Sequence, residues 1–230
     1  PEAHLTQAQP LMSEKPQACI FDLDGVIVDT ARYHFSAWSE LANELVIPFN
    51  EEDNEQLKGL SRIDSLEFIL RKGSLVLDNH TKVRLMDRKN DRYLSHVKTM
   101  TPAELFPGVL EFIDELRAEG VRIGLGSSSR NAPLILDLCC ITDRFETVVD
   151  GNSITLSKPD PEVFLTGAQA LGAQPENSVV FEDAVSGVKA GKAGGFRVVG
   201  VGSPEVLSEA DFTISSFEGF SLQELLSRLS

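Results

Sequence analysis

The sequence predicts an α/β fold in which a doubly wound parallel sheet forms the core and a small helical cap is inserted after the first strand. Residues 17–21 form an apolar run that ends abruptly in charged residues and a glycine, as expected of a buried strand. Residues 30–102 show helical spacing and no convincing strand. After Phe106-Pro107-Gly108, strand and helix patterns alternate, which is typical of a parallel sheet with helices on both faces.

These patterns divide the chain into three expected parts. Residues 16–29 and 103–230 would form the catalytic core, and residues 30–102 the cap. Residues 1–15 are polar and contain proline, which favours a flexible N-terminal tail. The first cap helix has apolar residues at helical spacing, and we expect Thr30 to cap its first turn.

The core elements are expected in strict alternation after the cap. The helices are predicted over residues 109–119, 131–138, 161–171 and 184–193, and the strands over 121–126, 147–149, 178–181 and 197–201. Ligands of such sheets bind at the carboxyl ends of the strands. Chemically active residues follow three of the predicted strands. Asp22 and Asp24 follow residues 17–21, Ser127 follows 121–126, and Glu182 and Asp183 follow 178–181.

Composition restricts the partners. With 21 Lys and Arg against 35 Asp and Glu, the net charge is -14, which argues against binding of nucleic acid or anionic membranes. A phosphorylated substrate would then need a locally positive pocket, supplemented by a divalent cation. The three cysteines have neither disulfide nor zinc spacing, and no apolar stretch reaches the roughly 18 residues of a membrane span. We expect a cytoplasmic monomer.

Four carboxylates suggest a site for a hard cation. Asp22 and Asp24 follow one strand, and Glu182 and Asp183 follow another, so their oxygens would suit Mg²⁺. Other interpretations stay open at this point. The Asp-Leu-Asp-Gly segment is also a good turn, and the Glu182-Asp183 pair would also suit the first turn of a helix.

The order of the motifs identifies a family. FDLDGVIVDT, Ser127, SKPDPEVF and FEDAVSGVKAG resemble, in order, the four motifs of the haloacid dehalogenase superfamily of phosphotransferases, from residue 21 to about residue 191. The segments TARYHFSAW, NEQLKGLSRIDSL, RKND and GSSSRNAP resemble the cap and phosphate loop of its beta-phosphoglucomutase family. The chain departs from that pattern at Ser128, where alanine is expected, and at Arg130, where lysine is expected.

The resemblance assigns roles in phosphoryl transfer. It implies that Asp22 attacks phosphorus, forms an aspartyl phosphate and binds Mg²⁺. Asp24 would act as general acid and base and lend its backbone carbonyl to the metal. Ser127 and Lys158 would hold phosphoryl oxygens. Glu182 and Asp183 would complete the metal site.

The resemblance also implies a set of substrate-binding residues. The guanidinium of Arg62 suits bidentate binding of a phosphate, although a lone arginine is usually a surface cation. His34 and Trp38 would otherwise be ordinary packed side chains. The expected substrate-binding residues are His34, Trp38, Lys58, Gly59, Ser61, Arg62, Lys89, Ser128, Ser129, Arg130 and Asn131.

Two candidate phosphate sites favour a mutase. One lies at Asp22, and the other draws on Arg62 and Arg130-Asn131. The resemblance implies interconversion of beta-D-glucose 1-phosphate and glucose 6-phosphate through beta-glucose 1,6-bisphosphate. The alternative is a magnesium-dependent sugar-phosphate phosphatase of the same superfamily. A phospho-acceptor signalling domain would lack Asp24 and the cap, and a dehalogenase substrate would have no phosphate to pair with the metal.

Overall fold

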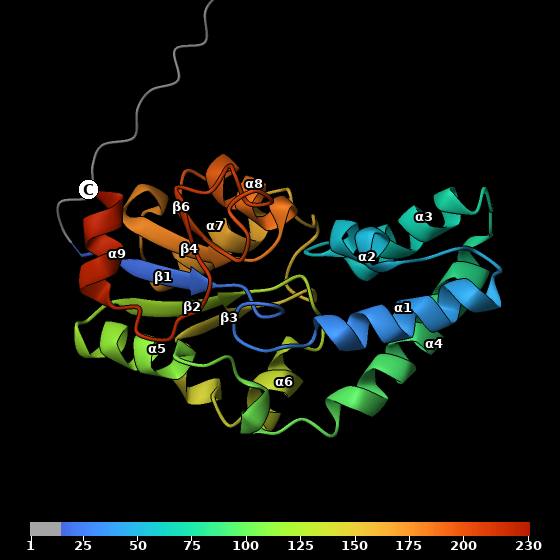
Figure 1. Cartoon of the computed structure of the whole chain (residues 1–230), viewed down its shortest axis with the longest axis horizontal. Helices are drawn as coiled ribbons and strands as arrows, with labels where there is room; N and C mark the ends of the chain where they lie inside the picture. The colour runs from blue at the N-terminus through green and yellow to red at the C-terminus, as the bar shows by residue number, and fades with distance from the viewer. Residues whose placement is uncertain (1–14) are drawn as a thin grey trace, which may run out of the picture.

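The computed structural model describes residues 15–230 (Figure 1). The expected tail therefore lies outside the described residues, apart from Lys15, whose ammonium group donates a hydrogen bond to the backbone oxygen of Glu119. Among the described residues, no helix is long and apolar enough to cross a membrane.

A six-stranded, wholly parallel sheet forms the centre of the core. The strands are β1 (Ala18–Phe21), β2 (Arg122–Gly126), β3 (Thr147–Val149), β4 (Ser178–Glu182), β5 (Arg197–Val201) and β6 (Phe212–Ile214). Their order is β3-β2-β1-β4-β5-β6, so β1 lies between β2 and β4. Phe21, the last residue of β1, pairs with Leu125 and Phe181. The residues that follow these strands therefore meet at one edge, where ligands bind in doubly wound sheets.

Helices cover both faces of the sheet, which confirms the predicted fold class (Figure 1). The core helices are α5 (Val109–Ala118), α6 (Ala132–Leu138), α7 (Glu162–Leu171), α8 (Val185–Ala193) and α9 (Leu222–Leu229). Alternation along β1 separates two apolar cores, because successive strand side chains point to opposite faces. Cys19 and Phe21 pack with α5, α6 and α9, whereas Ala18 and Ile20 pack with α7 and α8.

Four helices follow β1 and lie beside the core, over the carboxyl ends of the strands (Figure 1). They are α1 (Ala31–Glu44), α2 (Glu51–Leu57), α3 (Arg62–Lys72) and α4 (Asn79–Val97). They bury a separate apolar cluster that includes Trp38, Leu41, Leu66 and Ile69. We call residues 30–102 the cap, and these boundaries remain a prediction.

The two chain segments that join cap and core run side by side. Val28 and Leu105 form an antiparallel bridge. The amide of Asp29 donates to the backbone oxygen of Glu104 at 3.2 Å, and the amide of Phe106 donates to that of Ile27 at 3.0 Å. The cap therefore enters and leaves the core at one place.

Two features differ from the sequence-based expectations. Thr30 occupies the N-cap position of α1, but its side chain accepts no capping hydrogen bond, so the expected cap is wrong. Its hydroxyl donates instead to the Asp24 carboxylate. No element was expected after residue 201, where β6 has three residues and α9 has eight. Three residues give little periodic signal, but Leu222, Leu225 and Leu229 recur at helical spacing in α9, so this helix was open to prediction.

This C-terminal part contributes aromatic rings to the core. The Phe217 ring is 2% exposed, and its centroid lies 6.1, 5.7 and 5.6 Å from those of Phe21, Phe112 and Phe181. The C-terminal segment thus packs directly against the strand that carries Asp22.

We predict that Phe217→Ala lowers the free energy of unfolding by about 3 to 5 kcal/mol, because it removes a buried ring and leaves a cavity. Urea denaturation of the purified variant measures this loss. Val206→Ala is the control, since Val206 is 54% exposed and its truncation should change stability by less than about 0.5 kcal/mol. Equal effects of the two substitutions would contradict the packing role of Phe217.

Candidate active site

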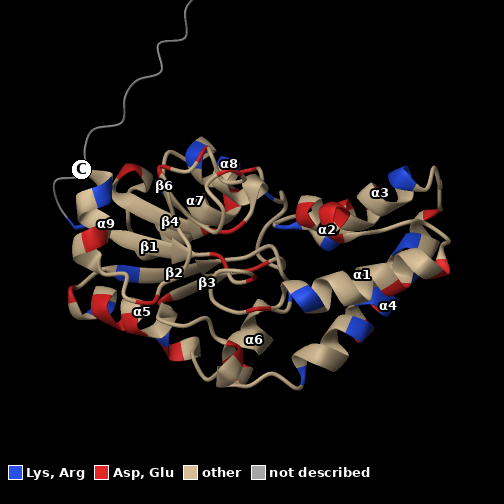
Figure 2. Ribbon diagram, in the orientation of Figure 1, with Lys and Arg blue, Asp and Glu red and all other residues tan. Residues whose placement is uncertain are grey.

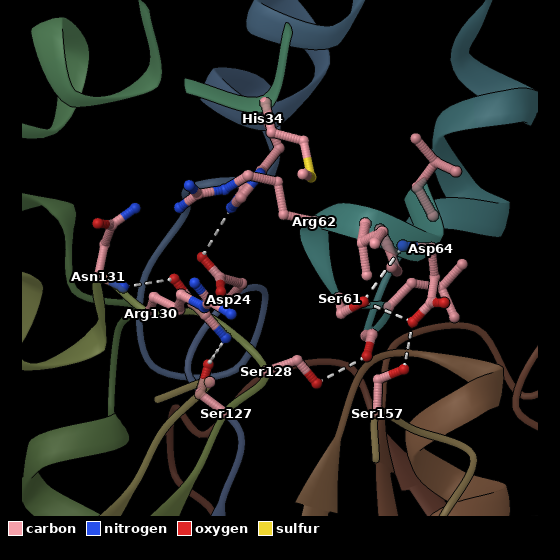
Figure 3. A pocket seen from close by; sticks show the side chains of 18 of the residues that line it. Asp24, His34, Ser61, Arg62, Asp64, Ser127, Ser128, Arg130, Asn131 and Ser157 are labelled. Atoms are coloured by element: carbon pink, nitrogen blue, oxygen red, sulfur yellow. Dashed lines mark hydrogen bonds and ion pairs between the residues drawn. The ribbon is translucent and has the colours of Figure 1, made fainter. Parts of the chain in front are cut away.

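A cavity of about 530 Å³ lies between the cap and the carboxyl ends of the strands (Figure 3). The structure brings fifteen of the predicted site residues into its lining. They are Asp22, Asp24, His34, Trp38, Lys58, Gly59, Ser61, Arg62, Lys89, Ser127, Ser128, Ser129, Arg130, Asn131 and Asp183. Lys158 and Glu182 do not line the cavity, but both are buried and Lys158 contacts Asp22.

A buried ammonium group joins two carboxylates beneath the cavity floor. Lys158 Nζ lies 2.6 Å from Asp22 Oδ1 and 2.5 Å from Glu182 Oε1, and it also donates to the Gly126 backbone oxygen at 3.2 Å. Burial alone would lower the pKa of Lys158, but the two carboxylates raise it above its ordinary value. Lys158 therefore remains a cation.

The environment of Asp22 is crowded with negative charge. Burial raises the pKa of Asp22 well above its ordinary value, and the charges of Glu182, Asp24 and Asp183 act in the same direction against the attraction of Lys158. A further cation beside Asp22 would relieve this repulsion and favour the ionised, nucleophilic form.

Asp22, Glu182 and Asp183 form a cluster suited to a metal ion. One carboxylate oxygen from each residue lies within 4.8 Å of the others. Burial and the neighbouring Glu182 raise the pKa of Asp183 to about 7, although the nearby Lys58 opposes this. Three convergent carboxylates with a single buried lysine match the oxygen ligands that hard divalent cations prefer. The Asp24 side chain lies outside this cluster.

Two glycines permit the close packing around these carboxylates. Gly25 has φ +82°, and a Cβ on it would lie 2.2 Å from Asp183 Oδ2. A Cβ on Gly187 would lie 1.9 Å from Glu182 Oε1. Gly25 is therefore required by both conformation and space, and Gly187, which has an ordinary helical conformation, by space alone.

The Asp24 carboxylate belongs to a second, polar group that links core and cap. It accepts a hydrogen bond from the Thr30 hydroxyl, and its Oδ1 lies 3.6 Å from His34 Nε2. Burial would raise the pKa of Asp24, but these contacts and the charge of Lys89 hold it below its ordinary value. The ionised form, which accepts protons, is favoured here.

Lys89 contacts His34 and is packed between aromatic rings. Its Nζ is 2.9 Å from His34 Nδ1, and 4.7 and 4.8 Å from the ring centroids of Trp38 and Tyr93. Burial, followed by the charge of Arg62, lowers the pKa of Lys89 to about 7. Burial and the charge of Lys89 also lower the pKa of His34.

Tyr93 was missed by the sequence analysis. It is fully buried, and its ring centroid lies 4.2 Å from that of His34. Tyr93 follows Lys89 by four residues on α4, so the i, i+4 relation on one helix face was the available signal.

One part of the cavity wall is basic and rich in amides. Arg62 Nη2 donates to Asn90 Oδ1 at 2.7 Å, and Asn131 Nδ2 donates to the same oxygen at 3.0 Å. Burial, followed by the charge of Arg130, lowers the pKa of Arg62. Figure 3 shows Arg62 above Arg130 and Asn131, so the cap and the core each contribute to this wall. Asn90 was not among the expected residues.

The cap loop around Lys58 contacts the core directly. Lys58 Nζ lies 3.2 Å from Asp183 Oδ2 and 3.0 Å from Glu55 Oε2. The hydroxyl of Ser128 donates to the Gly59 backbone oxygen at 2.8 Å. Ser61 is the N-cap of α3 and accepts a hydrogen bond from the Asp64 amide at 3.2 Å.

The serine loop after β2 is folded by its own side chains. The amide of Ser129 donates to Ser127 Oγ at 3.1 Å, and that of Asn131 donates to Ser129 Oγ at 3.2 Å. These turns direct Ser127 and Arg130 into the same cavity.

Known proteins with two kinds of activity resemble this chain. The family model for haloacid dehalogenase-like hydrolases matches residues 16–195. A beta-phosphoglucomutase of Bacillus subtilis is 43% identical over 91% of this chain and 93% of its own length. A phosphorylated carbohydrates phosphatase of Thermotoga maritima is 30% identical over 80% of this chain and 85% of its own length. The crystal structure of a beta-phosphoglucomutase from Clostridium difficile matches with a TM-score of 0.90 at 35% identity, and covers 93% of this chain and 97% of that one.

We predict that Lys89 makes stability depend on pH above neutrality. Its pKa is about 7 in the folded protein and about 10.4 in an unfolded chain, so between these values the unfolded state binds more protons. Stability should therefore rise with pH across this range, by about 2 kcal/mol between about pH 7.5 and about pH 9.5. Lys89→Met should remove this increment. Urea denaturation of both proteins at the two pH values tests this, and parallel pH dependences would contradict it.

Proposed function

The chain belongs to the haloacid dehalogenase-like hydrolase family, and we propose that within it this protein is a beta-phosphoglucomutase that interconverts beta-D-glucose 1-phosphate and glucose 6-phosphate. One observation carries this proposal beyond the family. One cavity is lined by the carboxylate nucleophile Asp22 and also by a basic, amide-rich group, Arg62, Arg130 and Asn131, to which both core and cap contribute.

Asp22 is the proposed nucleophile. One of its oxygens would attack phosphorus while the bond from phosphorus to the sugar oxygen breaks, which gives an aspartyl phosphate. Lys158 fixes the Asp22 carboxylate at 2.6 Å and offsets charge that a phosphoryl group brings to this end. The hydroxyl of Ser127 would donate to a phosphoryl oxygen.

Asp24 would move the proton. In return transfer, a sugar hydroxyl attacks the aspartyl phosphate and gives its proton to the Asp24 carboxylate, and Asp24 then protonates the sugar oxygen that leaves in the next cycle. The Thr30 hydroxyl and His34 favour the ionised form that accepts the proton.

Asp22, Glu182 and Asp183, with the backbone carbonyl of Asp24, would hold Mg²⁺, which when bound neutralises charge on the phosphoryl oxygens. The convergence of three carboxylates at the end of β1 and β4 supports this assignment.

The wall formed by Arg62, Arg130 and Asn131 would bind the phosphate that is not being transferred. A mutase must hold the glucose 1,6-bisphosphate in two orientations with one phosphate at each end, whereas a phosphatase needs only the reacting end. Two guanidinium groups from separate elements suit this second phosphate. Because one chain supplies both ends, we expect the protein to act as a monomer.

We predict that the wild-type enzyme, with Mg²⁺, beta-glucose 1-phosphate and a trace of the bisphosphate, accumulates glucose 6-phosphate in phosphorus NMR spectra. Asp22→Asn should abolish this conversion, because an amide is not a competent nucleophile, and should leave the circular dichroism spectrum unchanged. Release of inorganic phosphate alone would support the sugar-phosphate phosphatase instead.

We further predict that Arg62→Ala lowers mutase turnover at least about 100-fold, because a misplaced second phosphate removes the orientation that transfer requires. Phosphorylation of Asp22 by acetyl phosphate, which has no second phosphate, should stay within about 3-fold of wild type, since this reaction involves only the nucleophile end. Arg71→Ala is the matched control, because Arg71 is an exposed arginine in the last turn of the same helix. Equal loss of both reactions would mean that Arg62 does not bind the second phosphate.

A further inference from the structure

Two core serines hold the cap loop through hydrogen bonds that no step of the reaction uses. Ser128 Oγ donates to the Gly59 backbone oxygen at 2.8 Å, and Ser186 Oγ donates to the Lys58 backbone oxygen at 2.8 Å. Ser128 follows β2 and Ser186 lies in the first turn of α8, so the loop is held from two separate core elements. Within residues 15–230, neither carbonyl accepts a backbone hydrogen bond.

The fit between loop and core is close at this point. Gly59 has φ +74°, and a Cβ on it would lie 2.4 Å from Ser186 Oγ and 3.4 Å from Lys158 Cδ. Only glycine allows the cap backbone to approach the core this closely in this conformation. The loop therefore rests directly over the lysine that holds Asp22.

The other polar contacts between cap and core near the cavity involve different chemical groups from the two serine bonds. Lys58 contacts Asp183, His34 contacts Asp24, and Asn131 contacts Asn90, so each contact involves a group assigned to the metal ion, the transferred proton or a phosphate. The Ser157 hydroxyl donates to Asp64 at the exposed rim. The Ser128 and Ser186 bonds instead join a neutral hydroxyl to a backbone oxygen, and neither oxygen is assigned to the metal ion or to the nucleophile.

We propose that Ser128 and Ser186 form a latch that holds the cap loop Lys58–Gly59 on the core and biases the ligand-free protein toward the closed arrangement. They act as positioning residues, because a closed cap keeps bulk water from Asp22. Position 128 is also one of the two at which the sequence departs from the family pattern. The alanine expected there has no hydroxyl, so the Ser128 hydrogen bond is a feature of this chain and not of that pattern.

Hydrogen–deuterium exchange of the ligand-free protein tests the latch. One hydrogen bond changes the ratio of closed to open forms by about 2- to 10-fold, so Ser128→Ala and Ser186→Ala should each speed exchange at residues 57–61 by about that factor. The double variant should exchange faster than either. Ser128→Thr, which keeps the hydroxyl, should exchange at close to the wild-type rate.

Two internal comparisons separate a latch from general destabilisation. Exchange in β1 should stay unchanged in all latch variants. Ser178→Ala is the matched control, because its hydroxyl also donates to a backbone oxygen, that of Gln174 at 2.7 Å, but within the core. Unchanged exchange at residues 57–61 in the double variant, or an equal increase in β1, would overturn the proposal.

A kinetic measurement extends the test and rests on the proposed function. Ser186 does not line the cavity, so Ser186→Ala should raise the KM for glucose 1-phosphate by up to about 5-fold with a smaller change in kcat, because apparent binding weakens in proportion to the closed fraction. An unchanged KM would count against the latch. If the wild-type enzyme converts no sugar phosphate, the proposed function fails, while the exchange experiment still decides the latch.

Discussion

The ion pairs of Lys158 are the interaction on which the site depends. A buried carboxylate that carries a negative charge is costly unless a partner compensates it. Lys158 compensates both Asp22 and Glu182 and is itself held by the Gly126 backbone oxygen, so β1, β2 and β4 are tied together where they meet the cavity. The Glu182 carboxylate also accepts a hydrogen bond from the Ala184 amide, and this bond fixes the turn that contains Asp183. The geometry of the nucleophile end follows from this one buried cation.

The distribution of charge resolves the conflict between an acidic protein and an anionic substrate. The net charge is -14, and acidic side chains are concentrated on outer elements such as α2 and α5 (Figure 2). Around the cavity, Lys58, Arg62 and Arg130 provide positive charge at short range, while Asp22 and Asp183 belong to the candidate cation site, where a bound cation would offset their charge. Because exposed charges are screened over about 8 Å in physiological salt, the local groups decide what the cavity binds.

The fold was largely predictable because its strands and helices alternate with strong periodicity, and the motif order located the residues at the strand ends. β6 was not predicted because its three residues lack the flanking helix pattern that located the equally short β3, whereas α9 carries leucines at helical spacing and was open to prediction. The contacts of Asn90 were not predicted because they depend on how α4 packs against α3 and the core, whereas Tyr93 was open to prediction from its position four residues after Lys89 on the same helix. The sequence predicts Thr30 as a helix cap, but in the folded protein its hydroxyl donates a hydrogen bond to Asp24. At Thr30 the tertiary contact with Asp24 therefore decides the side-chain hydrogen bond, not the local preference for a helix cap.

The paired linkers at Val28 and Leu105 also bear on how such proteins diversify. The two ends of the inserted segment lie at adjacent positions on the core. The segment is therefore topologically equivalent to a long hairpin loop. A replacement of different length or shape would need to match only these two neighbouring attachment points, without any change in strand order. The nucleophile is thus encoded in the core and Arg62 in the inserted segment, so selection can alter some of the substrate contacts while the nucleophile stays fixed.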